Sequence, residues 1–156
     1  MPGKKNRKIL IMKIAIGSDH AGFKVKEALK QFLKEKGHDV IDYGTNSEQS
    51  CDYPDFALRV ANDVAQNASE KGVLICGTGI GMSITANKVK GIRAALCHDE
   101  LTAEMSRKHN DSNIFCAGSK TSEINKIFSM LSIWLSTPFE SGRHEKRVNL
   151  IQKAEQ

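Results

Sequence analysis

Residues 72–81 read Gly-Val-Leu-Ile-Cys-Gly-Thr-Gly-Ile-Gly, an apolar run that passes directly into a glycine-rich loop. The run does not alternate between apolar and polar positions, which is typical of a short strand buried on both faces. Four more runs of this kind are spread along the chain, so we predict five buried strands. The other four runs are Lys13–Gly17, Asp39–Tyr43, Ile92–Cys97 and Asn113–Ala117.

The stretches between the runs carry apolar residues at helical spacing. Such stripes lie within residues 25–33, 56–68 and 124–135, and a last helix is predicted from about residue 143 to residue 154. Strands that alternate with helices indicate a parallel sheet with helices on both faces. We therefore predict an α/β protein with a three-layer α/β/α fold and a five-stranded parallel sheet.

The positive charge of the chain is concentrated at its amino terminus. The 156 residues include 23 Lys and Arg against 18 Asp and Glu, a net charge of +5. Four of the bases and no acid lie in residues 1–11, so residues 12–156 hold 19 bases against 18 acids, or +1. We expect a basic tail over 1–11 and a single domain over 12–156. A body so close to neutral argues against nucleic-acid binding, and no run approaches the roughly 18 apolar residues of a membrane span.

The four cysteines show neither a Cys-x-x-Cys pair nor the spacing of a zinc site. We interpret them as free thiols in a reducing cytoplasm rather than as a disulfide framework. Cys97 and Cys116 fall within or at the end of predicted strands and are expected in the core. The sequence offers no convincing metal-binding cluster.

Polar residues follow the predicted strands, and ligands of parallel α/β sheets bind at the carboxyl ends of their strands. Asp19 and His20 come after the first run. Asp19 has a plain structural explanation as a helix cap. The adjacent Asp-His pair in such a loop nevertheless favours contact with a ligand.

The loop from Cys76 to Gly81 is the most informative of these segments. Glycine lets backbone N–H groups approach an anion closely, and the positive end of the following helix favours the thiolate form of Cys76. The alternative is a nucleotide-binding loop with an inert cysteine. Against that alternative, the spacing is not Gly-x-Gly-x-x-Gly, and the loop lacks the Lys of a P-loop.

Two further features have both a structural and a functional interpretation. A helix is also predicted after the fourth run, and His109 lies near its end, where it would stabilise the helix dipole without any catalytic role. Arg143 and Arg147 are four residues apart and share one helix face, which is usually only solvated. Functionally, the two planar guanidinium groups suit a clamp on phosphate.

Taken together, these segments resemble the ribose-5-phosphate isomerase B family, which also contains galactose-6-phosphate isomerase subunits. The similarity covers about residues 13–150, with the segments in the family's order. It implies a flavodoxin-like strand order 2-1-3-4-5 and a homodimer with shared active sites, with a tetramer as an alternative. The matching segments are Gly17–Gly22, Asp52–Pro54, Ile75–Gly81, Asn87–Lys88, Gly91–Ala94, Ser106–Asn113 and Gly142–Val148.

The resemblance also implies roles for individual residues, and it implies neither a metal nor another cofactor. Cys76 would be the base that moves a proton between sugar carbons 2 and 1. His109 of the partner subunit would open the furanose ring, with Asn110 beside it. The remaining implied contacts are Thr78 and the backbone of Gly77, Gly79, Ile80 and Gly81 with the enediolate, Asp19 and His20 with the sugar, Tyr53 at the border of the pocket, and Arg143 and Arg147 with the phosphate.

The function that follows is a metal-independent isomerase that interconverts ribose 5-phosphate and ribulose 5-phosphate in the pentose phosphate pathway. One branch of the family has a Glu where this chain has Met82, so Cys76 places the chain in the cysteine branch. Lys120 stands where relatives often have Arg, which leaves its contact with phosphate open. Two alternatives remain, an isomerase for allose or galactose 6-phosphate and a nucleotide- or flavin-binding module without catalytic activity.

Overall fold

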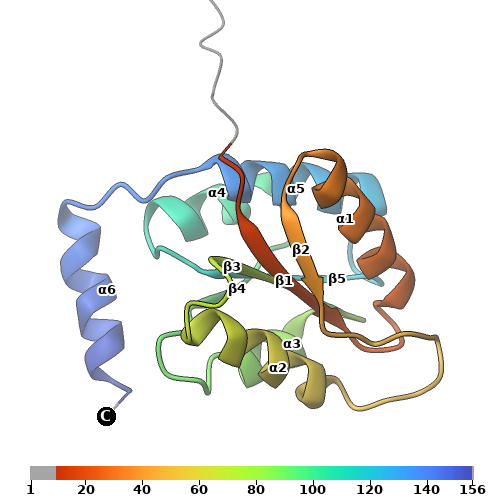
Figure 1. The fold of residues 1–156 in the computed structure, drawn as a ribbon. Helices are drawn as coiled ribbons and strands as arrows, with labels where there is room; N and C mark the ends of the chain where they lie inside the picture. Colours follow the sequence, from red (N-terminus) through yellow and green to blue (C-terminus); the bar gives the residue numbers. More distant parts are fainter. Residues whose placement is uncertain (1–9, 156) are drawn as a thin grey trace, which may run out of the picture.

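The computed structural model describes residues 10–155, so residues 1–9 of the predicted basic tail lie outside the described residues. Strands and helices alternate along this range, as predicted (Figure 1). In chain order the elements are β1 (Lys13–Ser18), α1 (Phe23–Glu35), β2 (Asp39–Asp42), α2 (Tyr53–Ala65), β3 (Lys71–Cys76), α3 (Ile80–Ala86), β4 (Ala94–Leu96), α4 (Glu100–Lys108), β5 (Ile114–Gly118), α5 (Ile124–Ser136) and α6 (Arg143–Lys153).

Both faces of the sheet are covered, which confirms the three-layer α/β/α fold. Figure 1 shows α1, α4 and α5 on one face and α2 and α3 on the other. Alternate residues of one strand enter the two cores: Val73 and Ile75 pack toward α1 and α5, whereas Leu74 packs toward α2 and α3. This two-sided burial explains why the strands read as continuous apolar runs.

All strands are parallel, in the order β2-β1-β3-β5-β4. The fold class is confirmed, while the last two strands are exchanged relative to the implied order 2-1-3-4-5. Their burial gives the physical reason, because the five residues of β5 are all buried and suit a position between two neighbours. The three residues of β4 are only partly covered, which suits the outermost strand of the sheet.

Helix α6 stands at one end of the sheet, apart from the two helical layers (Figure 1). Its apolar residue Val148 is buried within this chain, whereas Leu150 and Ile151 are about half exposed. The carboxylate of Glu155, just beyond α6, accepts a hydrogen bond from the Gly91 N–H, which ties the end of the helix to the loop before β4.

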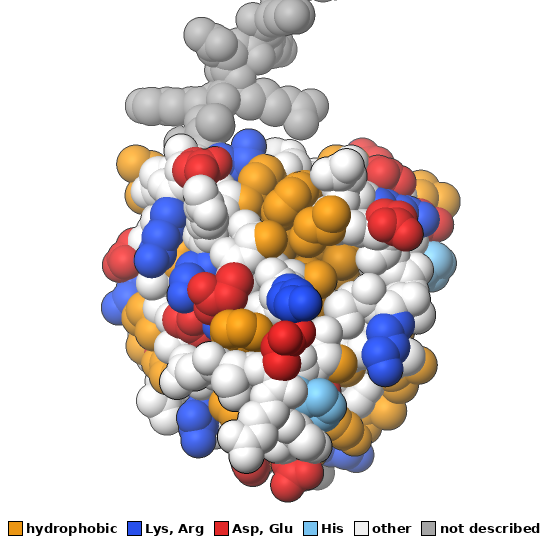
Figure 2. All heavy atoms as spheres, turned by 90° about the vertical axis from the view of Figure 1, so that its right-hand side faces the viewer, with side chains coloured by type: hydrophobic (Ala, Val, Ile, Leu, Met, Phe, Trp, Pro, Cys, Tyr) orange, Lys and Arg blue, Asp and Glu red, His pale blue; other side chains and the backbone are white. Residues whose placement is uncertain are grey.

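The surface charges and the free cysteines are as the composition predicts. Figure 2 shows acidic and basic side chains intermixed on the side that it displays, without a continuous basic area there. No helix within residues 10–155 is long and apolar enough to cross a bilayer.

All four cysteines are free, and Cys97 and Cys116 lie in the core as predicted. Burial raises the pKa of Cys97 to about 11 and that of Cys116 well above its usual value.

Candidate active site

The parallel sheet has two edges that carry different predicted site residues. In the pairing of β3 with β5, Gly72 is opposite Ile114 and Cys76 is opposite Gly118. The carboxyl edge is the edge where β1, β3 and β5 end. The amino edge is where α4 returns the chain to the start of β5. Four residue steps separate Gly72 from Cys76, so the two edges lie about 13 Å apart along the strands.

The loop after β3 holds the thiol of Cys76 at the carboxyl edge. Cys76 is 5% exposed, and its Sγ accepts a hydrogen bond from the Gly79 N–H at 3.1 Å. Gly79 has a φ of +77°, and a Cβ there would lie 2.6 Å from Leu96 Cδ1, so only glycine fits this turn. The hydroxyl of Thr78 accepts a hydrogen bond from the Ile80 N–H at 3.3 Å. Thiol and loop therefore form one hydrogen-bonded unit.

The segment after β5 braces this loop from the side. The Ser119 N–H donates to the Cys76 carbonyl and the Lys120 N–H to the Gly77 carbonyl, both at 2.9 Å. The aliphatic part of Lys120 lies 3.5 Å from the position that a Cβ on Gly77 would take. Lys120 therefore lies against the loop that holds Cys76. Ser119 was not predicted from the sequence, although its place two residues after the fifth predicted strand was a usable signal.

Asp19 and His20 lie at the same edge, in the turn after β1. Asp19 is buried, and its carboxylate accepts a hydrogen bond from the Gly22 N–H at 3.0 Å. Its own N–H donates to the Ile75 carbonyl, which joins the turn to β3. The Nδ1 of His20 accepts a hydrogen bond from the Cys51 N–H at 3.2 Å. Since Nδ1 acts as acceptor, the ring proton of neutral His20 lies on Nε2.

Tyr53 completes the group at the carboxyl edge. A Cβ on Gly81 would lie 2.6 Å from the Tyr53 ring, so the ring lies directly over the first turn of α3. Tyr53 is 40% exposed, which leaves much of its side chain open to solvent. Met82, one residue further along α3, is fully buried in the core. The fold thus brings together the predicted residues 19, 20, 53 and 76–81.

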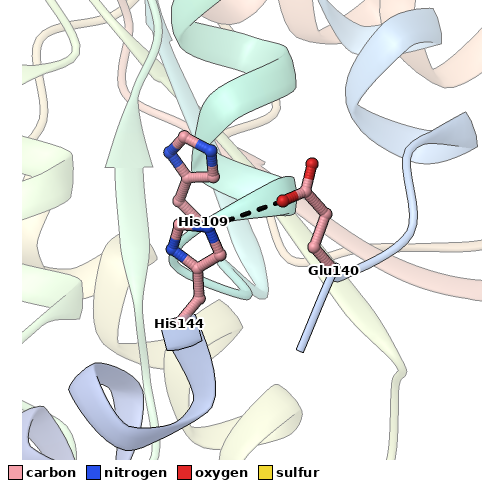
Figure 3. Close-up of side chains that lie close together, drawn as sticks. All are labelled: His109, Glu140 and His144. Carbon is pink, nitrogen blue, oxygen red and sulfur yellow. Dashed lines mark ion pairs between the residues drawn. The ribbon is translucent and has the colours of Figure 1, made fainter. Parts of the chain in front are cut away.

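The other predicted site residues lie at the amino edge. His109 ends α4, and its imidazole stacks on that of His144, with ring centroids 4.1 Å apart and planes inclined by 12° (Figure 3). The Nε2 of His144 lies 3.4 Å from a carboxylate oxygen of Glu140. Burial lowers the pKa of His144, and the neighbouring His109 and Arg143 lower it further. Arg143 and Arg147 project from α6 and are exposed, as is Asn110.

The turn that carries His109 and Asn110 is held by a buried arginine. The guanidinium of Arg107 donates to the Thr137 carbonyl at 3.2 Å and to the Asp111 carboxylate at 2.9 Å. It also lies over the ring of Trp134, 5.8 Å from the ring centre. These contacts fix the end of α4, which keeps His109 in place beside α6.

A group of three potential metal ligands was not visible in the sequence. His109, Glu140 and His144 bring their ligand atoms within 4.8 Å of one another. Glu140 and His144 are far from His109 in the chain, so no local spacing predicted the group. The motif around Arg143 included His144, but it assigned no role to this residue.

The comparison with known proteins decides the family. Residues 14–151 match the family model described as Ribose/Galactose Isomerase. The chain belongs to the ribose/galactose isomerase family. Ribose-5-phosphate isomerase B of Escherichia coli is 44% identical to this chain over 144 residues, which is 92% of this chain and 97% of that protein.

Solved structures of this type share the fold of the chain closely. Ribose-5-phosphate isomerase B of Clostridium thermocellum superposes with a TM-score of 0.92 at 47% identity, covering 92% of this chain and 97% of that one. The Mycoplasma genitalium enzyme, solved with bound ribulose-5-phosphate, gives 0.89 at 40% identity and covers 92% and 95%. The resemblance to this family and the prediction of an isomerase are confirmed, which disfavours the nucleotide- or flavin-binding alternative.

Proposed function

We propose that the protein interconverts ribose 5-phosphate and ribulose 5-phosphate through an enediolate, as a step of the pentose phosphate pathway. The observation that carries the proposal is the Cys76 thiol held on a glycine-rich loop at the carboxyl edge. Similarity to relatives named for this substrate supports it. Residues 12–156 would act as one domain. The four free thiols are compatible with the cytoplasmic location that we predict.

Cys76 would act as the base of the proton transfer. Its thiolate takes the proton from sugar carbon 2 of the aldose and returns it to carbon 1, while the hydroxyl proton on oxygen 2 moves to oxygen 1, which gives the ketose. Transfer of this kind by a positioned side chain contributes about a hundred- to ten-thousand-fold. The backbone N–H groups between Gly77 and Gly81, with Thr78, would stabilise the oxyanion of the enediolate. Asp19, His20 and Tyr53 would contact the sugar from the neighbouring loops.

We further propose a homodimer in which each site uses both chains. His109, Asn110, Arg143 and Arg147 lie at the amino edge. About 13 Å along the strands separates that edge from Cys76, which is too far for Cys76 and His109 of one chain to act on neighbouring atoms of the same sugar. A second copy that places its amino edge against the carboxyl edge of the first would complete the site. His109 would then open the furanose ring and the two arginines would hold the phosphate. Ile80 and Ile84 of α3, each at least half exposed, offer apolar surface for this contact.

The role of Cys76 is tested by the Cys76→Ala variant, with Cys116→Ala as the matched control. Replacing Cys116 is the same chemical change in the same core cluster, away from the loop. We expect Cys76→Ala to lose turnover by about a hundredfold or more while binding of ribulose 5-phosphate persists. Turnover near the wild-type level in Cys76→Ala would refute the role. Chelator should not lower the activity of the wild type.

Shared sites are tested by mixing two inactive variants. Dimers of Cys76→Ala with His109→Ala chains contain one site with both residues intact and one with neither. Because half of the dimers are mixed after random assembly of a two-fold symmetric pair, about one quarter of the wild-type activity should return. Activity that stays absent in the mixture would show that Cys76 and His109 act within one chain.

The family description, which includes galactose, keeps a six-carbon sugar phosphate as the second candidate. The chemistry at Cys76 would be the same, and the depth of the pocket would decide the preference. Comparing kcat/KM for ribose 5-phosphate with that for allose 6-phosphate and galactose 6-phosphate separates the two. A higher value for a six-carbon substrate would replace the first proposal.

A further inference from the structure

Three side chains with metal-binding atoms converge beside the end of α4. The imidazoles of His109 and His144 stack, and the Glu140 carboxylate approaches from the segment before α6 (Figure 3). The ligand atoms all lie within 4.8 Å of one another, and His144 Nε2 is 3.4 Å from Glu140 Oε2. A tetrahedral zinc ion with bonds of about 2.0–2.1 Å separates its ligand atoms by about 3.4 Å. One pair of ligand atoms therefore already stands at the required distance.

The Nε2 atom of His144 provides an independent sign of a missing ligand. His144 is 5% exposed, and this buried atom has no hydrogen-bond partner within residues 10–155. The contact with Glu140 meets the distance of an ion pair without the geometry of a hydrogen bond. A buried polar atom without a partner is costly, and native structures usually satisfy such atoms. Coordination to a cation would satisfy it.

We infer that His109, Glu140 and His144 form a binding site for a divalent transition-metal ion such as Zn²⁺. Two imidazoles and one carboxylate with an open fourth position are a common zinc ligand set. His109 must turn out of the stack, because ring nitrogens bind a metal in the plane of the ring. It is only half-buried and ends its helix, so this rotation does not disturb the core.

The charges around the group limit its affinity. Arg143 and Arg147 lie on the same helix as His144 and repel a cation, whereas the Glu140 carboxylate attracts it. The site should therefore be weaker than a closed structural zinc site and should release its ion to a chelator. Such a site is suited to reversible occupation.

Occupation of this site would have a consequence for catalysis. A metal-bound His109 cannot act on the sugar ring, so the ion would inhibit the isomerase. This consequence rests on the proposed function, while binding of the ion does not. Direct binding measurements therefore keep the two questions apart.

Binding is tested with untagged, chelator-treated protein by titration calorimetry with Zn²⁺. The variants are Glu140→Gln and His144→Asn, and the matched control is His98→Asn. His98 forms an exposed pair with Asp99 at 3.7 Å and lacks a second histidine. Absorption of Co²⁺ in the same proteins reports the geometry and the ligand type. That spectrum also detects binding at the Cys51 thiol, which lies 3.9 Å from His20 Nδ1.

We expect one ion per wild-type chain, a tetrahedral Co²⁺ spectrum without thiolate bands, and unchanged binding in His98→Asn. Glu140→Gln and His144→Asn should each weaken binding by about tenfold or more, since even residues outside the ligand shell contribute about that much. Wild-type affinity in both variants, thiolate bands, or the absence of binding in the wild type would overturn the inference. If Zn²⁺ binds but does not inhibit the isomerase, the role of His109 fails and the metal site stands.

Discussion

The Sγ of Cys76 accepts a hydrogen bond from the backbone N–H of Gly79, three residues further along the chain, at 3.1 Å. The bond exists because Gly79 adopts a φ of +77°, which turns its N–H back toward the thiol. Conformation at position 79 and orientation of the thiol are therefore coupled. This coupling can be separated experimentally from the general cost of a positive φ.

Gly79→Ala should lower both stability and turnover. The new Cβ would meet Leu96 Cδ1 at 2.6 Å and the Ala117 backbone at 2.8 Å, at a φ that alanine rarely adopts. Such strain costs about 1–3 kcal/mol. Gly91→Ala is the control, because Gly91 has a φ of +85° with open space around its Cβ position. Urea unfolding should show a loss in both variants, whereas kcat should fall only in Gly79→Ala. An equal loss of kcat in Gly91→Ala would contradict the coupling.

The contact between Tyr53 and Gly81 predicts a strong energetic interaction between the two positions. Gly81→Ala alone forces the Tyr53 ring away, because the Cβ would lie 2.6 Å from it. In a Tyr53→Ala background the same change should be neutral or should stabilise the protein by up to about 1 kcal/mol, since alanine is favoured over glycine within a helix. Unfolding free energies of the four proteins give the interaction energy. Additive effects would show that the ring does not occupy this space.

The Asp42 carboxylate should stabilise the protein by compensating the buried charge of Lys26. Its ammonium group is fully buried and lies 2.6 Å from the Asp42 carboxylate, which also receives Lys30 at 3.0 Å. Asp42→Asn leaves the buried charge with its remaining partner Glu27, so we expect a loss on the order of 3 kcal/mol. Lys24→Met removes the exposed pair with Glu48 and should cost at most about 1 kcal/mol. Urea unfolding at neutral pH measures both, and equal losses would refute the distinction.

His38 should make the protein less stable in mild acid. Burial lowers the pKa of His38, and the charge of Lys36 lowers it further. Its Nδ1 accepts a hydrogen bond from the Met12 N–H at 3.1 Å, which requires an unprotonated nitrogen. Below about pH 6.5 the unfolded chain therefore binds a proton that the folded chain resists, and stability falls as the pH falls.

The measurement compares unfolding free energies between pH 8 and pH 5. His38→Asn should reduce the pH dependence relative to the wild type, although it lowers stability at every pH. His98→Asn, a change at an exposed histidine, should keep the slope of the wild type. An unchanged slope in His38→Asn would assign the acid sensitivity to other groups.

The elements of the fold were predictable because each depends on neighbours in the chain. Apolar runs without alternation marked all five strands, and the stripe over 124–135 marked α5 nearly to its ends. The start of the fourth strand was predicted two residues early, at Ile92. The Arg93 N–H donates to the Asn113 side chain, a partner twenty residues away that no local pattern reveals. The glycine-rich loop was equally readable, since its conformation is local.

By itself the sequence determined the α/β class, the polar loops and the thiol of Cys76 on a glycine-rich turn. Only the tertiary structure decided that β5 lies between β3 and β4. It alone placed the predicted site residues at two opposite edges and brought Glu140 and His144 to His109. The physical reason is the range of the interactions. Helices, strands and turns form from neighbouring residues, whereas strand order and side-chain clusters depend on contacts between segments far apart in the chain.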